Sequence, residues 1–173
     1  MGRGHAEQLV PMIAGLPAKG KAGRILVSRG PGSFTGVRIG IATARALGIA
    51  WTAQVESYPT LALVAATARE DAPNTPLSVA MRAGHGEIFV QNIDAEGNPR
   101  DSAASLKPDE AAAACQHELV VGTMATAVAT MIEKGKGVDV LPDARHAFAL
   151  PQSIFSDDLS PAYGRGPDAK LPT

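Results

Sequence analysis

Gly30-Pro-Gly-Ser-Phe-Thr-Gly-Val-Arg-Ile-Gly-Ile-Ala-Thr-Ala-Arg-Ala-Leu-Gly-Ile-Ala-Trp51 constrains the structure of this chain most, and we call it the decisive stretch. The aliphatic run at residues 25–27 before it is typical of a short buried strand, and Gly30-Pro31-Gly32 ends that strand with turn residues. Ser33 or Thr35 is placed to cap the N-terminus of a helix that continues to Trp51. The stretch therefore predicts a strand, a tight turn and a long helix.

Small residues recur at every fourth position of this stretch, and most of its other residues are apolar. A helix that is apolar all round is normally buried all round. Each glycine inside a helix costs roughly 1 kcal/mol relative to alanine, so close contacts must compensate. One face is expected to pack on the protein's own sheet, and binding of a partner protein by the small-residue face stays open. The small residues are Gly32, Gly36, Gly40, Ala44 and Gly48, and the polar ones are Arg38, Thr43, Arg45 and Thr52.

Two other interpretations of the same glycines do not fit. Gly30-x-Gly32-x-x-x-Gly36 has one residue too many for a dinucleotide-binding fingerprint, and no Gly-Lys-Ser/Thr follows to form a phosphate loop. Gly36-x-x-x-Gly40 has the spacing of a membrane dimerisation motif, but Arg38 and Arg45 inside the run argue against a spanning helix.

The stretch resembles the signature of the TsaB (YeaZ) family, bacterial subunits of the machinery that makes threonylcarbamoyladenosine in tRNA. Two further segments extend the resemblance to both ends of the chain. His5-x-Glu7-x-Leu9-x-Pro11-Met12-Ile13 is similar to the helix that precedes the signature, and Tyr163-x-Arg165-x-Pro167-Asp168-Ala169-Lys170 is similar to the closing motif. The sequence departs from the family at Met81-Arg82-Ala83-Gly84, where relatives carry Met-Asp-Ala-Arg.

The resemblance implies an α/β fold of the two-lobed actin and sugar-kinase type, which is ribonuclease H-like. In the family, strands with an Asp-Thr-Ser turn precede the His-x-Glu helix, and this sequence begins directly at that helix. We therefore expect a truncated first lobe at residues 1–57, whose sheet would expose an edge, and a second lobe at residues 58–173.

The resemblance also implies a non-catalytic scaffold of the complex that adds threonylcarbamoyl to an adenosine of tRNAs that read ANN codons. Such a subunit binds the catalytic transferase TsaD, an ATPase subunit (TsaE) then joins, and a homodimer is possible. We expect the subunit to contact tRNA only through the assembled complex. We expect no association with a membrane. The residues expected at the partner interface are His5, Leu9, Met12, Ile13, Ser33, Thr35, Gly36, Arg38, Ile39, Gly40 and Thr43.

Composition limits the function classes. The 173 residues carry a net charge of −1, whereas a protein that binds nucleic acid alone needs an excess of clustered Lys and Arg. One cysteine, Cys115, excludes an internal disulfide framework and suits the cytoplasm; it lies in an alanine-rich stretch and is expected to be a core thiol. No signal peptide or spanning segment is recognisable in the sequence.

Candidate catalytic groups are few. His5 lacks a histidine four residues later, because position nine is Leu9, and His85, His117 and His146 are isolated. The residues therefore predict no metal site, no cofactor and no catalytic residue. The alternatives are a stand-alone metalloprotease-like enzyme, a kinase-like ATPase and a direct tRNA binder, and each lacks the residues that it needs.

The remaining sequence alternates strands and helices, which indicates an α/β protein. Helices are predicted at residues 8–16 (with Pro11 in the first turn), 59–68 (capped by Ser57), 108–114, 124–134 and 144–150. Strands are predicted at residues 54–57, 77–81, 87–93, 119–121 and 138–141, and residues 163–173 as an extended end.

Overall fold

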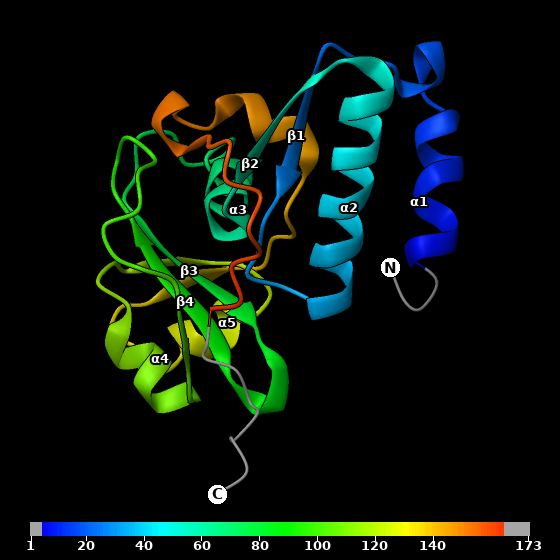
Figure 1. Ribbon diagram of the computed structural model, residues 1–173. Coiled ribbons are helices and arrows are strands. Elements are labelled where there is room, and N and C mark those ends of the chain that lie inside the picture. Colours follow the sequence, from blue (N-terminus) through cyan, green and yellow to red (C-terminus); the bar gives the residue numbers. More distant parts are fainter. Residues whose placement is uncertain (1–4, 165–173) are drawn as a thin grey trace, which may run out of the picture.

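The computed structural model describes residues 5–164, with side chains from Glu7 onward. This part of the chain forms two β-sheets, a small parallel sheet and a larger mixed sheet, with helices around and between them (Figure 1). The helices are α1 (His5–Ala14), α2 (Phe34–Trp51), α3 (Thr60–Ala68), α4 (Pro108–Ala114) and α5 (Ala125–Ala129), with 3-10 helices η1 (Pro17–Gly20), η2 (Gly84–Gly86), η3 (Ala144–Ala149) and η4 (Gln152–Ile154). The strands are β1 (Arg24–Ser28), β2 (Gln54–Tyr58), β3 (Leu77–Arg82), β4 (Ile88–Ile93), β5 (Ala104–Leu106), β6 (Leu119–Val121) and β7 (Lys136–Val138).

The small sheet is made by the decisive stretch and the residues around it. β1 and β2 pair in parallel, from Arg24 opposite Gln54 to Ser28 opposite Tyr58, and α2 is the crossover that connects them. α2 packs on this sheet, and α1 lies beside α2 (Figure 1). Among the described residues β1 pairs with β2 alone, and all five of its residues are half-buried. The predicted strand, turn and long helix are confirmed.

The larger sheet has the order β5-β4-β3-β6-β7. β3 pairs antiparallel with β4 and parallel with β6, and β4 and β6 continue the sheet to β5 and β7. Because successive residues of a strand point to opposite faces, Ala80 and Val120 face α4 and α5, whereas Val79 and Val121 face α3. The predicted α/β class is confirmed. The division at residues 57 and 58 stays a prediction.

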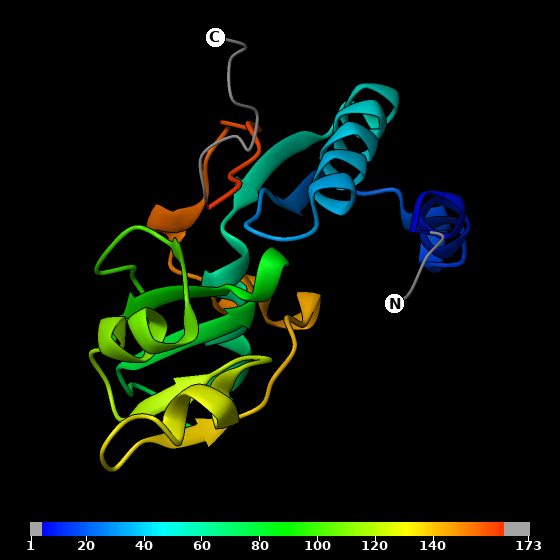
Figure 2. The same ribbon diagram turned by 90° about the horizontal axis from the view of Figure 1, so that it is seen from below.

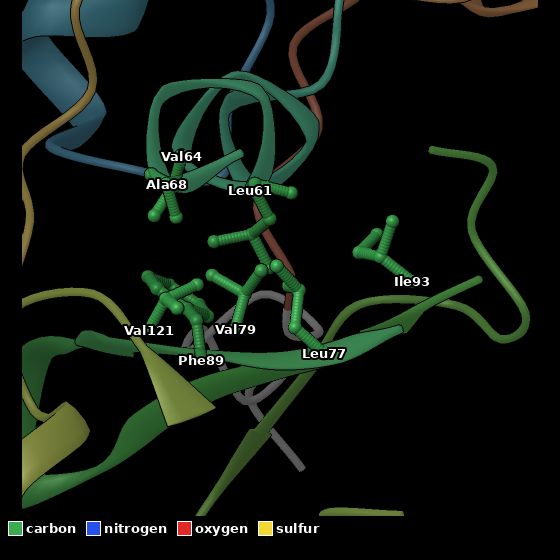
Figure 3. Close-up of a cluster of buried hydrophobic side chains, with 9 residues drawn as sticks. Leu61, Val64, Ala68, Leu77, Val79, Phe89, Ile93 and Val121 are labelled. Atoms are coloured by element: carbon green, nitrogen blue, oxygen red, sulfur yellow. The ribbon is translucent and has the colours of Figure 1, made fainter. Parts of the chain in front are cut away.

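α3 is the most deeply buried helix. On one side its Leu61 and Val64 meet the larger sheet at Leu77 and Val79 (Figure 3). On the other side Leu63 packs with residues from the small sheet and from the chain after η3. Its residues 61–66 and Ala68 are all buried. The rule that an apolar helix is buried all round therefore applies to α3.

Four helices differ from the sequence prediction, and three of them differ in their first turn or in helix type. α1 begins at His5, so Pro11 lies inside the helix and not in its first turn. Ser57 does not cap α3, because it lies in β2 and donates its hydroxyl to the Asp158 carbonyl oxygen at 2.6 Å; α3 begins at Thr60 after Pro59. The helix predicted at 144–150 is the 3-10 helix η3.

α5 is much shorter than the predicted helix at residues 124–134. It ends at Ala129, where the chain turns back to place β7 beside β6. The Thr130 hydroxyl donates to the Ala127 carbonyl oxygen at 2.7 Å. Lys134 has a left-handed φ of 61°, and Gly135 lies against the backbone of Ala129. β7 consequently starts at Lys136, two residues before its predicted start, and the predicted strand at 138–141 is wrong beyond Val138.

Candidate partner interface

The N-terminus of α2 has the cap that its sequence predicts. The Ser33 hydroxyl accepts a hydrogen bond from the Gly36 N–H at 3.3 Å, which satisfies one of the free donors of the first turn. Gly30 has a φ of +105°, and a Cβ at this position would overlap the Ala162 carbonyl oxygen. Glycine at position 30 therefore allows the backbone of Ala162 to approach the turn before α2.

Most of α2 is not buried, so the expectation that this apolar helix is buried all round is wrong. Its buried residues are Ile41, Ala44 and Gly48, which lie toward β1 and β2. Phe34 is 53% exposed and Ile49 is 85% exposed. The sheet beneath α2 has only two strands in the described residues, which is too narrow to cover more than one face of the helix.

The small residues of α2 spiral around the helix. A spacing of four residues advances about 40° per step beyond a full turn, so the row changes face along the helix. At its C-terminal end Ala44 is buried, and a Cβ at Gly48 would overlap Val55 Cγ2 of β2. A Cβ at Gly40 would lie 3.8 Å from Val27 Cγ2, an ordinary contact. Gly48 therefore serves the protein's own sheet, whereas Gly40 has room.

α1 contributes further exposed apolar side chains. Met12 is 52% exposed and Val10 is 59% exposed, and Leu16, just after the helix, is 55% exposed. Leu9 and Ile13 are half-buried and lie one turn apart on α1, between the directions of Val10 and Met12 around the helix. In the view from below, α1 projects away from both sheets (Figure 2). α1 and α2 thus carry apolar surface that the described residues leave uncovered.

The expected interface residues fall on these two helices and on the turn before α2. His5 begins α1, but its side chain lies outside the described residues. Ser33, Thr35 and Arg38 are exposed near the start of α2. Gly36, Ile39, Gly40 and Thr43 are half-buried. Their assignment to a partner interface stays a prediction.

An aromatic cluster at the start of α2 was not predicted. The Phe34 and Tyr163 rings stack with their centroids 5.0 Å apart. The Arg38 guanidinium lies 3.8 Å from the centroid of the Phe34 ring, and its Nε donates to the Tyr163 hydroxyl at 3.0 Å. Such cation–π contacts stabilise exposed sites by about 0.5–1 kcal/mol. Arg38 thus holds Tyr163, near the end of the described chain, against the start of α2.

Residues 156–163, which we call the strap, connect this cluster to the small sheet. Ser156 forms an antiparallel bridge with Ser57 of β2. The Arg29 Nη1 lies 3.1 Å from Asp158 Oδ2, and the Ala162 N–H donates to the Arg29 carbonyl oxygen at 2.7 Å. Tyr163 was expected to begin an extended, solvated end. It is half-buried, and residues 165–173 of that expected end lie outside the described residues.

A hollow between the two sheets contains the residues that depart from the family pattern. It has a volume of about 390 Å³, and Arg82, Ala83 and Gly84 line it on one side. Phe34 and Tyr163 line it opposite, and Arg82 is exposed to solvent. Arg82 supplies one positive charge there.

The described residues contain no group of three or more His, Cys, Asp or Glu side chains that could hold a metal ion. His146 Nε2 of η3 lies 3.5 Å from Glu70 Oε2, just after α3. Cys115 is half-buried and its thiol donates to the Ala111 carbonyl oxygen at 3.3 Å. Burial raises the pKa of this thiol, which makes it a poor nucleophile at neutral pH. Within residues 5–164 no helix has the length and apolar character that crossing a membrane requires.

Comparison with known proteins agrees with this architecture. Residues 1–160 match the family model described as TsaD, tRNA N6-adenosine threonylcarbamoyltransferase. Among solved structures, YeaZ from Pseudomonas aeruginosa superimposes with a TM-score of 0.73 and 25% identity, over 92% of this chain and 84% of that one. A second structure from Pseudomonas aeruginosa, an uncharacterized protein with similarity to peptidase YEAZ, gives a TM-score of 0.69 and 28% identity over 86% of this chain and 75% of that one.

No curated protein matches the chain by sequence. The family model nevertheless covers almost the whole chain, and the structural matches extend over both sheets. The ribonuclease H-like and actin-like fold that the sequence implied is consistent with both. The chain therefore belongs to the TsaD family, and within it to the TsaB (YeaZ) group.

Proposed function

We propose that this chain is a non-catalytic scaffold subunit of the complex that makes threonylcarbamoyladenosine in tRNA. Its family places it in the context of tRNA modification. In this proposal α1 and α2 bind the catalytic transferase subunit TsaD, and the ATPase subunit TsaE joins that pair. Transfer RNA is contacted through the assembled complex in the cytoplasm.

The uncovered apolar surface of α1 and α2 carries the proposal. Five large apolar residues of this region are more than half exposed, and burying one such side chain stabilises a contact by about 1.5–3 kcal/mol. Exposed apolar side chains gathered on two helices that contact each other are typical of a protein–protein interface rather than of a monomer's surface. The five residues are Val10, Met12, Leu16, Phe34 and Ile49.

The proposal requires no catalytic group in the chain. Burial raises the pKa of the Cys115 thiol. The hollow that contains Arg82 is lined by no acid and no histidine. The second kind of function, a stand-alone protease or ATPase, has no observation in its favour.

A matched pair of methionine substitutions tests the proposal. Met12 on α1 is 52% exposed, and Met131 after α5, on the larger sheet, is 46% exposed. Met12→Asp should weaken the affinity for the purified transferase subunit by more than about tenfold, since it places a charge in an apolar contact. Met131→Asp should leave the affinity unchanged, and both variants should melt close to the parent because both side chains are exposed.

Affinity by isothermal titration and melting by circular dichroism are the two measurements. Formation of threonylcarbamoyladenosine by the reconstituted subunits provides the third, and Met12→Asp should abolish it. The proposal is refuted if the parent chain does not bind the transferase subunit, or if turnover by the chain alone is found and depends on its residues.

A further inference from the structure

The C-terminal end of α2 forms one side of an open groove with a volume of about 570 Å³. We propose that this groove, which we call the Arg45 groove, receives an apolar side chain of the transferase subunit with a carboxylate beside it. The inference rests on the proposed function and names the chemistry of the partner surface. The groove is lined by Arg45, Gly48, Ile49, Thr52, Ala53, Gln54 and Val55.

The apolar half of the proposal comes from the floor and rim of the groove. Ile49 is 85% exposed, which is more than any other large apolar side chain among the described residues. Gly48 is buried against Val55 of β2, and Ala53 and Val55 are half-buried in the floor of the groove. A partner side chain can therefore lie beside Ile49, over Ala53 and Val55, and remove Ile49 from water.

The charged half of the proposal comes from Arg45. Arg45 is exposed, and among residues 5–164 it has no carboxylate within ion-pair distance. Two other arginines of the first half are paired with carboxylates: Arg24 of β1 with Glu56 at 2.5 Å, and Arg29 after β1 with Asp158 at 3.1 Å. Arg45 is the charged residue in the lining of the groove, and a carboxylate is its natural partner.

The charge distribution of the chain extends this argument. Residues 1–57 carry seven Lys and Arg against two Glu and no Asp, whereas residues 58–173 carry nine Lys and Arg against fifteen acids. The net charge of −1 therefore hides a positive first half and a negative second half. Complementary charge steers association and disfavours wrong partners, so the first half favours an acidic partner surface.

A second copy of this chain fits the groove less well. A two-fold symmetric dimer through this face would bring the positively charged first half of one copy against that of the other, where each copy offers two acids, Glu7 and Glu56. A nucleic acid fits less well too, since phosphate binding needs clustered Lys and Arg, and the groove has one arginine beside an exposed Ile49.

Four variants of the intact chain test the inference against the purified transferase subunit of the same genome. Arg45→Glu should weaken binding by about tenfold or more at low salt, and the loss should shrink as salt screens the charges. Arg45→Lys keeps the charge and should bind within about threefold of the parent. Ile49→Ser should weaken binding at every salt concentration, because it removes apolar contact. Lys136→Glu, on the exposed edge strand β7, is the control and should have no effect.

The outcomes separate the inference from the proposed function. If the parent chain does not bind the transferase subunit, the proposed function fails. If the parent binds and both Arg45→Glu and Ile49→Ser bind equally well, the groove is not the contact and this inference alone is overturned. It is also overturned if Arg45→Glu acts only on self-association in sedimentation, or only on tRNA binding by the chain alone.

Discussion

Gly48 and Gly40 lie two turns apart on α2, yet substitution of each by alanine should change stability in opposite directions. Alanine is favoured over glycine inside a helix by about 1 kcal/mol. At Gly40 the new Cβ would lie 3.8 Å from Val27 Cγ2, so the gain is kept. At Gly48 the Cβ would overlap Val55 Cγ2 and lie 3.4 Å from the Ala53 carbonyl oxygen. Overpacking of this kind costs about 1–3 kcal/mol, which exceeds the gain.

The free energies of unfolding of the two variants should therefore differ by roughly 1–3 kcal/mol. For a chain of this size 1 kcal/mol shifts the melting temperature by about 2–4 °C, so the difference is measurable by calorimetry. Adding Val55→Ala to Gly48→Ala should remove the overlap, and the double-mutant cycle should show a favourable coupling. The reasoning is refuted if Gly48→Ala melts as high as Gly40→Ala and the cycle shows no coupling.

Two further predictions concern the end of the described chain and its cysteine. Tyr163→Ala should lower the free energy of unfolding by about 1–2 kcal/mol and speed proteolysis within the strap, because the stacking on Phe34 and the hydrogen bond from Arg38 are lost. Tyr163→Phe should lose only the hydrogen bond. Equal protease sensitivity of the parent and both variants would contradict this prediction. Because burial raises the pKa of Cys115, its alkylation by iodoacetamide at pH 8 should be slower in the native protein than in guanidinium chloride. The stability that the protonated thiol contributes should be fully present below its unfolded pKa and should be lost as pH rises through its folded pKa. A Cys115→Ala variant should therefore lose less stability at high pH than the parent does. Alkylation of the native protein at the unfolded rate would show that the thiol is not shielded.

The local signals of the decisive stretch predicted its structure closely. Turn residues ended β1 and Ser33 capped α2, so the strand, the turn and the start of the helix follow from interactions between residues close in sequence. Burial did not follow in the same way. α2 and α3 are both apolar, but only α3 has packing partners on both sides, and periodicity carries no information on which helix lies between the sheets.

The candidate interface could be predicted in part. The resemblance pointed to α1 and α2, but of the five exposed large apolar residues in this region it named Met12 alone. The aromatic cluster was missed because Phe34 and Tyr163 are 129 residues apart in sequence. The sequence around Tyr163 is rich in glycine and proline and gives no local sign that this tyrosine packs on α2. Gly30 was the one local signal of this contact, because only glycine leaves room there for the backbone of Ala162.

The position of α3 has a consequence for how the molecule responds to stress. One side of this helix belongs to the core of the larger sheet, and the other side packs with Tyr58, Leu150 and, at its edge, Leu26 of β1. A hinge between the two sheets would have to separate these buried contacts. The protein should therefore melt in a single cooperative transition, with calorimetric and van't Hoff enthalpies equal, and a substitution in α3 such as Leu63→Ala should lower the melting of both sheets together.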